Sequence, residues 1–426
     1  MRYKEAVSLL LGLSGRAMQP GLGRMRAALE ARGHPERAFE SVIVGGTNGK
    51  GSVAAMVAAG LAASGHKVGL FTSPHLHRLV ERFRVGGRTV SERRLADKVG
   101  ELSPWLLDPH SPQLTFFEAC TLVALELFRD AGCELSVLEV GLGGRLDATN
   151  VVRPRLSVIT SVGLDHQEWL GNSLREVARE KAGIIWEGVP VISGVRAPEP
   201  RAVIARRART KRAPIQCIDR DFSATPAPGG YRVVVGEQTF ERISLPLAGA
   251  HQADNLACAA SALIELSRLG VSLDPGAWGP AMRRVRWPGR LERISSRPVV
   301  LLDAAHNPAA CEMLARHLGE IRGEFARVVL LFGVLRDKDH PQMLALLRER
   351  VDRVVFSQPS VARARPAVEL AADFDGEGVV DPVKAFRRAR RLAGPRGLVV
   401  VAGSIFLLAP VRASLLGLRA DPPVTL

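Results

Sequence analysis

The chain has 426 residues, of which 46% are hydrophobic and 24% are charged. This composition excludes a disordered chain, and the length exceeds the size at which one hydrophobic core usually divides, so we expect two domains. No apolar run approaches the roughly 20 residues that a membrane-spanning helix needs, and we expect no membrane partner. The net charge of +15 is compatible with binding to nucleic acids or to polyanionic small molecules.

The cysteines and the first residues indicate a cytoplasmic protein. The five cysteines are odd in number and form no C-x-x-C pair, which argues against a disulfide framework or a structural zinc site. A reducing compartment fits this usage. In "MRYKEAVSLLLG", Glu5 interrupts the apolar stretch, so we expect an amphipathic helix and no signal peptide. The cysteines are Cys120, Cys133, Cys217, Cys258 and Cys311.

The stretch "VIVGGTNGKGSVAA" predicts a strand, a glycine-rich turn and a helix. Val42 to Val44 is typical of a buried strand, and Ser52 to Ala63 of a helix of small residues. Such a turn can bind phosphate, because backbone N–H groups and the helix N-terminus converge there and Lys50, on a solvent-facing loop, can reach a nucleotide. The strict phosphate-loop pattern has Gly in place of Val44 and Ser or Thr in place of Gly51, so a plain glycine-rich turn with a surface lysine is the alternative.

The next apolar runs predict a parallel sheet covered by helices. They are "KVGLFTS", "LSVLEVG", "LSVITSVG" and "VPVISG", with helical stretches between them. Ligands gather at the carboxyl ends of such strands, where Ser73, Glu139, Asp165 and His166 follow. Magnesium prefers oxygen ligands, so Ser73 and Glu139 are candidates, whereas His166 by itself is more typical of a hydrogen-bonded structural histidine.

Residues 215–247 depart from this pattern. "YRVVVGEQTFERISLPL" predicts a hairpin that turns at Gly236 and Glu237, as a small antiparallel addition. After "RWPGRLERI" the α/β pattern restarts with "RPVVLLDAAHNP", "RVVLLFGVLRDKD", "DRVVFSQ" and "GLVVVAGS". We therefore place the boundary near Pro288 to Arg293 and predict two α/β domains, over residues 1–293 and 294–426.

Two basic runs could favour nucleic acid. "RRARTKR" (Arg206 to Arg212) and "RRARR" (Arg387 to Arg391) both lie in helix-like segments with interleaved alanines. Phe386 is the only aromatic residue that adjoins either run, which is too little for a base-stacking surface, so we interpret both as solvated helix faces and expect no nucleic-acid partner.

The segment "LEVGLGGRLDATN" is harder to explain as a structural turn alone. It combines an acid at a strand end with three glycines that free the backbone. A tight turn accounts for Gly143 and Gly144, but it does not require Glu139, Arg145 and Asp147 together.

With these motifs, the chain resembles the folylpolyglutamate synthases and dihydrofolate synthases, relatives of the Mur peptidoglycan ligases. The resemblance covers nearly the whole chain, from "GLGRM" to "VAGSIFLL". Ten motifs carry it in the family's order: "GGTNGKGS", "TSPHL", "LTFFEA", "LEVGLGGRLDATN", "GLDHQEWLG", "REKAGI", "HQADNLACA", "PGRLE", "DAAHNP" and "GVLRDKD". It implies an N-terminal phosphate-loop ATPase-like domain with a parallel sheet and a C-terminal Rossmann-like glutamate-ligase domain.

The resemblance also implies site residues. The ATP-binding positions would be Thr47, Asn48, Gly49, Lys50, Gly51, Ser52, Asn255, Arg290 and Asp303, with Arg290 able to sense closure. The first magnesium would be held by Ser73, Glu139 and His166, which reverses the structural reading of His166. The pterin substrate would lie against Thr115, Phe116, Phe117, Glu118, Leu146 and Asp147. "DAAHNP" differs from the commoner "DGAHNP" by the methyl group of Ala304, from which we expect little effect.

The implied reaction is ATP-dependent amide formation. The γ-phosphoryl group of ATP activates a carboxylate as an acyl phosphate, which the amine of L-glutamate attacks. His306 and Ser404, at strand ends of the second domain, are the candidates for holding glutamate. The expected catalytic residues are Lys50, Lys181, Asp303 and His306.

Lys181, in "REKAGI", is one of only eight lysines among the 58 Lys and Arg residues. A plain surface lysine needs no explanation. Relatives with this motif carry a carbamylated lysine there, which would make Lys181 a ligand of a second magnesium. The reaction with carbon dioxide needs a neutral amine, so we expect a lowered pKa for Lys181.

The resemblance predicts a monomer that acts on dihydropteroate and on reduced folates. "QPGLGRMRAALE" and "LTFFEA" resemble segments that line the pterin site of bacterial enzymes with both activities. Folylpolyglutamate synthesis alone is one alternative, and a Mur ligase acting on a nucleotide-linked peptide is another. A nucleotide switch or nucleic-acid-binding ATPase would have an Asn-Lys-x-Asp motif or a strand-binding groove, and the sequence has no such motif.

Overall fold

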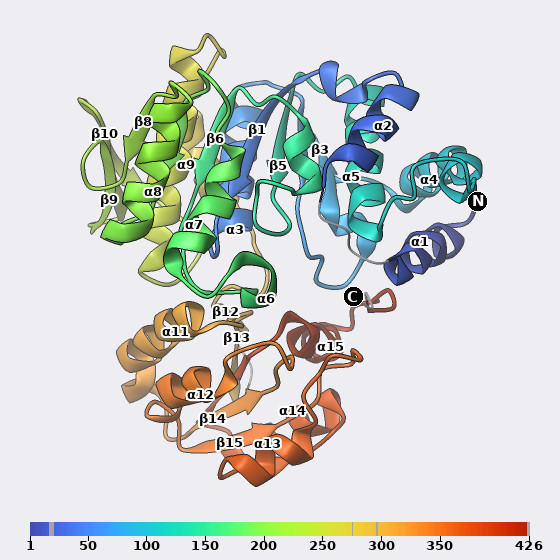
Figure 1. The fold of residues 1–426 in the computed structure, drawn as a ribbon. Coiled ribbons are helices and arrows are strands. Elements are labelled where there is room, and N and C mark those ends of the chain that lie inside the picture. The colour runs from blue at the N-terminus through green and yellow to red at the C-terminus, as the bar shows by residue number, and fades with distance from the viewer. Residues whose placement is uncertain (17–20, 275, 295–296, 424–426) are drawn as a thin grey trace.

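The computed structural model describes residues 1–16, 21–274, 276–294 and 297–423 (Figure 1). Gln19 and Pro20, the start of the predicted pterin-site segment "QPGLGRMRAALE", lie outside the described residues. Two α/β parts stand one above the other, with the end of the N-terminal part near α6 (Gln167–Leu170) facing the C-terminal part. None of the helices in the described ranges is long and apolar enough to cross a membrane.

The N-terminal part is built on an eight-stranded sheet in the order β4-β3-β2-β5-β1-β6-β7-β8. The six strands from β2 to β8 in this order are parallel, as the sequence predicts, whereas β3 and β4 add an antiparallel edge that it did not predict. The strands are β1 (Glu40–Gly45), β2 (Val68–Phe71), β3 (Phe83–Val85), β4 (Arg88–Thr89), β5 (Leu135–Glu139), β6 (Leu156–Ile159), β7 (Val191–Ser193) and β8 (Ile215–Cys217).

Helices cover both faces of this sheet, and each face has its own apolar core. One core lies under α1, α2, α4 and α5, and the other under α3 and α9, because the β-branched and leucine side chains of the parallel strands are buried on both sides. The helices are α1 (Tyr3–Gly12), α2 (Gly23–Ala31), α3 (Lys50–Ala63), α4 (Glu92–Leu107), α5 (Phe116–Asp130), α7 (Leu174–Lys181), α8 (Pro198–Thr210), α9 (His251–Arg268) and α10 (Trp278–Met282).

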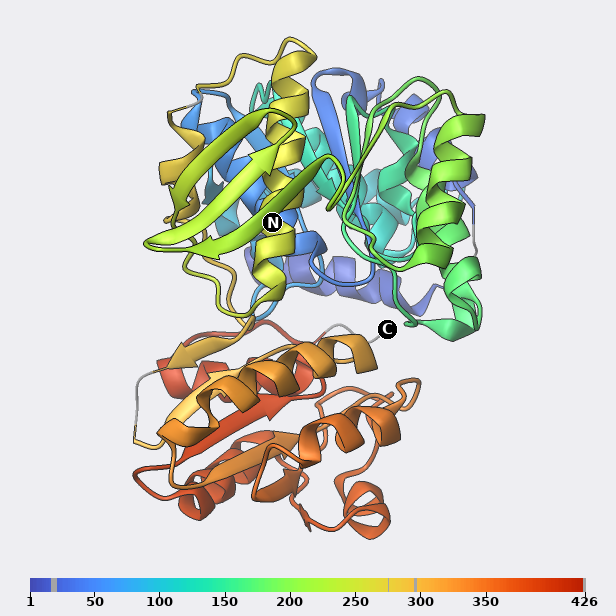
Figure 2. The same ribbon diagram turned by 90° about the vertical axis from the view of Figure 1, so that its left-hand side faces the viewer.

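The antiparallel addition is a separate three-stranded sheet that packs on α9 (Figure 2). It consists of β9 (Phe222–Ala227), β10 (Gly230–Val235) and β11 (Gln238–Ile243). Val235 pairs with Gln238, so the predicted turn at Gly236 and Glu237 is confirmed. The predicted extent is wrong at its start, because β8 pairs in parallel with β7 and belongs to the large sheet.

The C-terminal part holds a six-stranded sheet in the order β12-β13-β17-β14-β15-β16, with only β12 antiparallel. Its strands are β12 (Glu292–Ile294), β13 (Val299–Leu302), β14 (Val328–Phe332), β15 (Arg353–Phe356), β16 (Glu377–Gly378) and β17 (Leu398–Ala402). Its helices are α11 (Pro308–Ile321), α12 (His340–Arg348), α13 (Ala367–Asp373), α14 (Pro382–Ala393) and α15 (Ile405–Leu416). The two-part α/β class is therefore confirmed. The division at residues 293 and 294 stays a prediction, and it falls inside β12.

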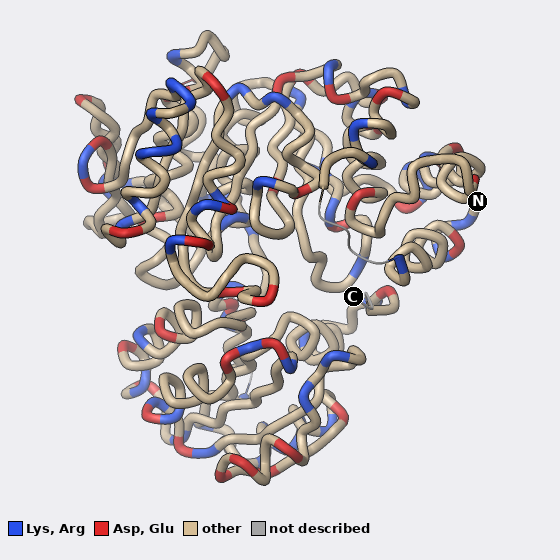
Figure 3. The backbone as a smooth tube through the Cα atoms, in the orientation of Figure 1, with Lys and Arg blue, Asp and Glu red and all other residues tan. Residues whose placement is uncertain are grey.

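Both basic runs lie on helices, as predicted. Arg206 to Arg212 covers the end of α8 and the turn after it, and Arg387 to Arg391 lies within α14. Arg212 is paired with Glu187, and Arg388 donates to Glu377 at 2.7 Å. Basic and acidic residues are interspersed along the backbone of both parts (Figure 3). The five cysteines are buried and free, in agreement with the prediction of no disulfide.

Candidate active site

The glycine-rich turn connects β1 to α3 at the carboxyl edge of the large sheet. Two of its glycines are required by space and by backbone conformation. Gly46 has φ +143°, and a Cβ there would lie 2.0 Å from Oγ1 of Thr160. Gly49 has φ +86°, and a Cβ there would lie 2.3 Å from Oδ1 of Asn255. Residues with a side chain rarely adopt such φ values, so glycine is required at both positions and the backbone of the turn is left uncovered there.

The residues after β6 hold this turn in place. The Thr47 hydroxyl donates to the carbonyl of Gly163 at 3.0 Å, and the Thr47 N–H donates to the carbonyl of Ser161 at 2.9 Å. The Asn48 N–H donates to Oγ of Ser161 at 2.9 Å, and the Thr160 hydroxyl donates to the carbonyl of Asn48 at 2.6 Å. The sequence did not predict a role for Thr160 or Ser161, although both stand directly after a predicted strand.

Lys50 is the first residue of α3, so the prediction that it lies on a solvent-facing loop is wrong. Its side chain is partly buried, and Nζ donates to the carbonyls of Gly46 and Thr47, both at 3.1 Å. Burial lowers the pKa of Lys50, against the opposing effect of the nearby charges of Glu139 and Asp165. The ammonium is therefore held over the turn itself, where it interacts electrostatically with one acid at the end of β5 and another in the segment after β6.

Lys181 reaches the same turn from the end of α7. Its Nζ donates to the carbonyl of Gly46 at 2.9 Å, so two lysine ammonium groups share one acceptor. The residue is only 3% exposed. Burial, followed by the charge of Lys50, lowers the pKa of Lys181 to about 7. The alternative of a plain surface lysine is therefore wrong.

Ser73 and Glu139 are brought together at the ends of β2 and β5. The Ser73 N–H donates to Oε2 of Glu139 at 2.9 Å. Glu139 is 4% exposed, and burial raises the pKa of its carboxyl although the charge of Lys50 acts in the opposite direction. A buried carboxylate whose charge is incompletely compensated, next to a serine, is suited to a divalent cation with oxygen ligands.

His166 belongs to a second group, which is centred on Asp165. His166 Nε2 lies 3.8 Å from Oδ1 of Asp165 and 3.5 Å from Nζ of Lys338. Burial lowers the pKa of His166 to about 4, although the charge of Asp165 opposes this shift. The imidazole is therefore neutral at pH 7, the form that can bind a metal ion.

Three side chains of the C-terminal part contact the carboxylate of Asp165. Lys338 Nζ donates to Oδ1 at 2.7 Å, Asn307 Nδ2 donates to Oδ2 at 3.0 Å, and His306 Nε2 lies 3.3 Å from Oδ2. Burial alone would raise the pKa of Asp165, but the hydrogen bond from His306 and the charges of His306, His166 and Lys338 hold it well below its usual range. This carboxylate thus links the N-terminal part to three residues beyond position 300.

Asn307 connects the two parts a second time, at the glycine-rich turn. Its side-chain amide exchanges two hydrogen bonds with that of Asn48, at 3.1 and 3.2 Å. Asn307 is 1% exposed and also caps α11 by accepting from the Ala310 N–H at 2.9 Å. The sequence motifs contain Asn307 and Lys338, but no role was predicted for either. The available signal was that they lie in the segments that follow β13 and β14.

The predicted pterin-site residues at the start of α5 also have structural partners. Thr115 and Glu118 cap the helix reciprocally, and Arg24 donates to both carboxylate oxygens of Glu118 at 3.2 Å. Phe116 is buried. Phe117 is partly buried, and a Cβ on Gly141 would lie 2.6 Å from its ring.

Asp147 organises the loop after β5. Its carboxylate accepts from the N–H of Leu142 at 2.9 Å and from the N–H and hydroxyl of Thr149 at 3.0 and 2.6 Å. Burial raises the pKa of Asp147, whereas these hydrogen bonds lower it. Leu146, beside it, is partly buried. The loop that approaches Phe117 is therefore held by a buried acid.

The remaining predicted residues lie near the junction or at the far strand ends. Asn255 Nδ2 donates to Oε1 of Gln252 at 2.9 Å, and the partly buried Arg290 interacts electrostatically with Lys50 and Glu139.

Asp303 accepts from the N–H groups of Leu291 and Ala305 at 2.8 and 2.9 Å. Ser404 is buried and caps α15 by accepting from the Phe406 N–H at 3.2 Å. Gly51 and Ser52 are buried in the first turn of α3.

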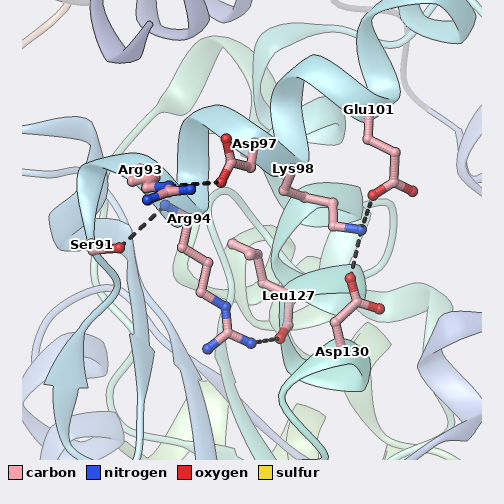
Figure 4. Close-up of a pocket in the computed structure, with 8 residues that line it drawn as sticks. All are labelled: Ser91, Arg93, Arg94, Asp97, Lys98, Glu101, Leu127 and Asp130. Atoms are coloured by element: carbon pink, nitrogen blue, oxygen red, sulfur yellow. Dashed lines mark hydrogen bonds and ion pairs between the residues drawn. The ribbon is translucent and has the colours of Figure 1, made fainter. Parts of the chain in front are cut away.

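A separate pocket of about 340 Å³ lies between α4 and α5 (Figure 4). Its buried lysine, Lys98, is paired with Glu101 at 2.6 Å, Asp130 at 2.5 Å and Glu126 at 3.2 Å. These carboxylates already neutralise the ammonium. None of the predicted site residues lines this pocket, which is formed by Ser91, Arg93, Arg94, Asp97, Lys98, Glu101, Leu127 and Asp130.

Two family models match the chain in succession. The Mur ligase middle domain matches residues 44–263, and the Mur ligase glutamate ligase domain matches residues 289–405. These ranges contain the glycine-rich turn and the residues that contact Asp165 from the C-terminal part.

Whole-length relatives agree with this match. The dihydrofolate synthase/folylpolyglutamate synthase of Bacillus subtilis is 34% identical over 97% of this chain and 99% of its own length. The structure of Escherichia coli FolC in complex with DHPP and ADP superposes with a TM-score of 0.87, at 32% identity, over 97% of this chain and 98% of that chain. The bifunctional Yersinia pestis enzyme complexed with AMPPNP and Mn ion superposes with a TM-score of 0.88, at 32% identity, over the same shares of the two chains.

The glycine-rich turn that accepts from two lysines, and the carboxylate of Asp165 that contacts the C-terminal part, both lie within the first matched range. Together with the matches along the whole chain, they show that this chain belongs to the dihydrofolate synthase/folylpolyglutamate synthase family of ADP-forming, ATP-dependent glutamate ligases.

Proposed function

We propose that this enzyme adds L-glutamate to dihydropteroate and to reduced folates, as a bifunctional dihydrofolate synthase and folylpolyglutamate synthase. The observation that carries the proposal is the convergence of Lys50 and Lys181 on the carbonyl of Gly46, beside the joined pair of Ser73 and Glu139. The relatives with DHPP and ADP, and with AMPPNP and Mn ion, support a pterin substrate, a nucleotide and a divalent metal at this site.

The first step is activation of the substrate carboxylate. The backbone N–H groups of the turn, at the start of α3, would bind the phosphates of ATP, and the ammonium of Lys50 would offset the charge that collects on the transferred phosphoryl group. Asn255, Arg290 and Asp303 would hold the nucleotide from the junction. Arg290 interacts electrostatically with both Lys50 and Glu139, which suits a residue that senses closure.

We also propose that two magnesium ions bind at this site, where they would supply additional positive charge during phosphoryl transfer. Ser73, Glu139 and His166 would hold the first. The second would be held by Lys181 as a carbamate, because a buried amine with a pKa of about 7 is partly neutral at physiological pH and can react with carbon dioxide.

The second step is attack by the amine of glutamate. The carboxylates of glutamate need cationic and polar partners, and we propose His306 and Ser404 for this role. His306 is already held at the interface, with Nδ1 2.8 Å from the carbonyl of Ala304 and Nε2 3.3 Å from Asp165. Acyl phosphates hydrolyse in open water, so a site between two parts that close on the substrate protects the intermediate.

The pterin substrate would lie against Thr115, Phe116, Phe117, Glu118, Leu146 and Asp147. In this structure Glu118 and Asp147 hold backbone and side-chain donors, so we assign them to shaping the pocket. Phe117 contacts the loop of Gly141 and is the aromatic surface available to a pterin or aminobenzoyl ring. We further propose that the enzyme acts as a cytoplasmic monomer.

The proposed function is tested by measuring ADP release with L-glutamate and dihydropteroate, with L-glutamate and tetrahydrofolate, and with L-glutamate alone. We expect release with each of the two pterin substrates and none without them. Release with tetrahydrofolate only would reduce the function to folylpolyglutamate synthesis. Release only with a nucleotide-linked peptide would indicate a Mur-type ligase, and stimulation by RNA or DNA would indicate a nucleic-acid-dependent ATPase.

Replacing Glu139 by glutamine is expected to lower kcat by about a hundredfold, because a metal ligand loses its charge with little change in volume. Initial rates measured against magnesium concentration check this, since the variant should need more magnesium than the parent. Glu134→Gln, an exposed residue at the opposite end of β5, is the matched control and should keep parental activity. A parent enzyme that is indifferent to magnesium would refute the metal site.

A further inference from the structure

Trp287 lies against Gly51 in the first turn of α3, although it belongs to the segment between α10 and β12. Its indole is partly buried and packs against the core under α3. A Cβ built on Gly51 would lie 2.6 Å from Cζ2 and 2.9 Å from Nε1 of Trp287. The ring therefore occupies the space into which a side chain at position 51 would point.

This contact explains why the turn departs from the strict phosphate-loop pattern. Gly51 is helical, so its backbone conformation does not require glycine, in contrast to Gly46 and Gly49. The Ser or Thr of the strict pattern would collide with the indole. Space, and not backbone freedom, determines glycine at this position.

Arg84 of β3 lies over the indole ring. The guanidinium carbon of Arg84 lies 5.3 Å from the centroid of the Trp287 ring, within the range of a cation–π interaction. Burial lowers the pKa of Arg84, so this guanidinium is also partly desolvated. The ring therefore contacts both β3 and the first turn of α3.

Trp287 also begins the crossing between the two parts. Gly289 and Leu291 follow with φ +75° and +44°, and the Leu291 N–H donates to Asp303 at 2.8 Å. The Ala304 N–H donates to the carbonyl of Gly289 at 2.9 Å. The crossing segment is thus anchored on the first turn of α3 at one end and on the end of β13 at the other.

We propose that Trp287 is a positioning residue that sets the first turn of α3 for nucleotide binding and makes ATP affinity depend on the junction between the two parts. The proposal rests on the proposed binding of ATP at the turn. Trp287 acts through the backbone of Gly51 and touches no reacting atom. Loss of its ring therefore affects the KM for ATP more than kcat.

The test is a double-mutant cycle of Gly51→Ala and Trp287→Ala, read out by the Kd of ADP and by the KM for ATP. Gly51→Ala is expected to weaken ADP binding about tenfold in the parent, because the new methyl group displaces the ring or the turn. In the Trp287→Ala background the same change should have less than about a twofold effect. Trp287→Ala alone should raise the KM for ATP about tenfold and leave the KM for glutamate unchanged.

Gly60→Ala is the matched control. It lies in the same helix, nine positions after Gly51. A Cβ there would meet Cδ1 of Leu263 at 2.5 Å and not the indole of Trp287. Its effect on the thermal unfolding midpoint should be the same with and without Trp287. Equal effects of Gly51→Ala on ADP binding in both backgrounds would overturn the proposal.

If Gly51→Ala alone does not fold, recovery of folded, ADP-binding protein in the double variant supports the proposal, and failure of both variants overturns it. Failure of the proposal for Trp287 can be distinguished from failure of the proposed function. A parent that binds ADP but forms no glutamate product refutes the proposed reaction, while the cycle on ADP affinity still measures the contact.

Discussion

Replacing Lys50 by methionine is expected to lower kcat about a thousandfold, in the range seen when a preorganised donor to a developing charge is removed. Methionine keeps the length and apolar stem of the side chain and removes the ammonium. In the structure this ammonium lies over the turn, on the carbonyls of Gly46 and Thr47, and interacts electrostatically with Glu139 and Asp165. Steady-state ADP release and the Kd of ADP, measured side by side, check the result.

The fold should survive this change. Because burial lowers the pKa of Lys50, the folded state disfavours its charged form, and removing that charge should not lower the thermal unfolding midpoint. Lys67→Met, at an exposed position just before β2, is the control for loss of a lysine and should retain full activity. Near-parental kcat in Lys50→Met would refute the phosphate-binding role of the turn.

Replacing Lys181 by alanine is expected to lower kcat about a hundredfold or more, because the ligand proposed for the second magnesium is lost. The proposed ligand is a carboxylate-like carbamate, so acetate in the buffer should restore part of the activity of Lys181→Ala. Lys181→Arg should be no more active than alanine, since a guanidinium stays protonated and cannot form the carbamate. Kinetics with and without acetate, together with mass spectrometry of the intact parent, check this.

The pH dependence of the parent gives a second readout for Lys181. Its pKa is about 7, so the neutral amine that reacts with carbon dioxide becomes scarce below this pH, and stimulation by added bicarbonate should fall there. Without carbon dioxide, the folded pKa of about 7 lies below the ordinary value of 10.5. The unfolded state then binds more protons between these two values, so the stability of the parent relative to Lys181→Met should rise with pH across that window. A fully active Lys181→Arg enzyme would rule out the carbamate.

Features that depend on neighbours in the chain could be predicted from the sequence. The alternation of apolar runs and helical stretches indicated two α/β parts, because strand and helix periodicities are local. The hairpin turn at Gly236 and Glu237, and the strand, turn and helix around Lys50, were predicted for the same reason. The order of ten motifs was enough to indicate the family, which the matches along the whole chain confirm.

Only the tertiary structure decided which strands are neighbours. β8 joins the large sheet instead of the hairpin, and β3 and β4 form an antiparallel edge, because strand pairing is set by packing between segments that no local pattern connects. The sequence likewise indicated a lysine in the turn, but its ammonium is folded back over the turn and partly desolvated.

The same reason applies to the site. Lys50 and Lys181 meet at Gly46 although they are 131 positions apart, because α7 returns to the carboxyl edge at which β1 ends. Lys338 donates to the carboxylate of Asp165 because the carboxyl edges of two different sheets face one another. The sequence by itself determined which residue types stand at the strand ends. The strand order and the packing of the two parts decided which of these residues share a carbonyl, an ion pair or an aromatic contact. The reason is that the distances between them are set by the fold and not by spacing along the chain.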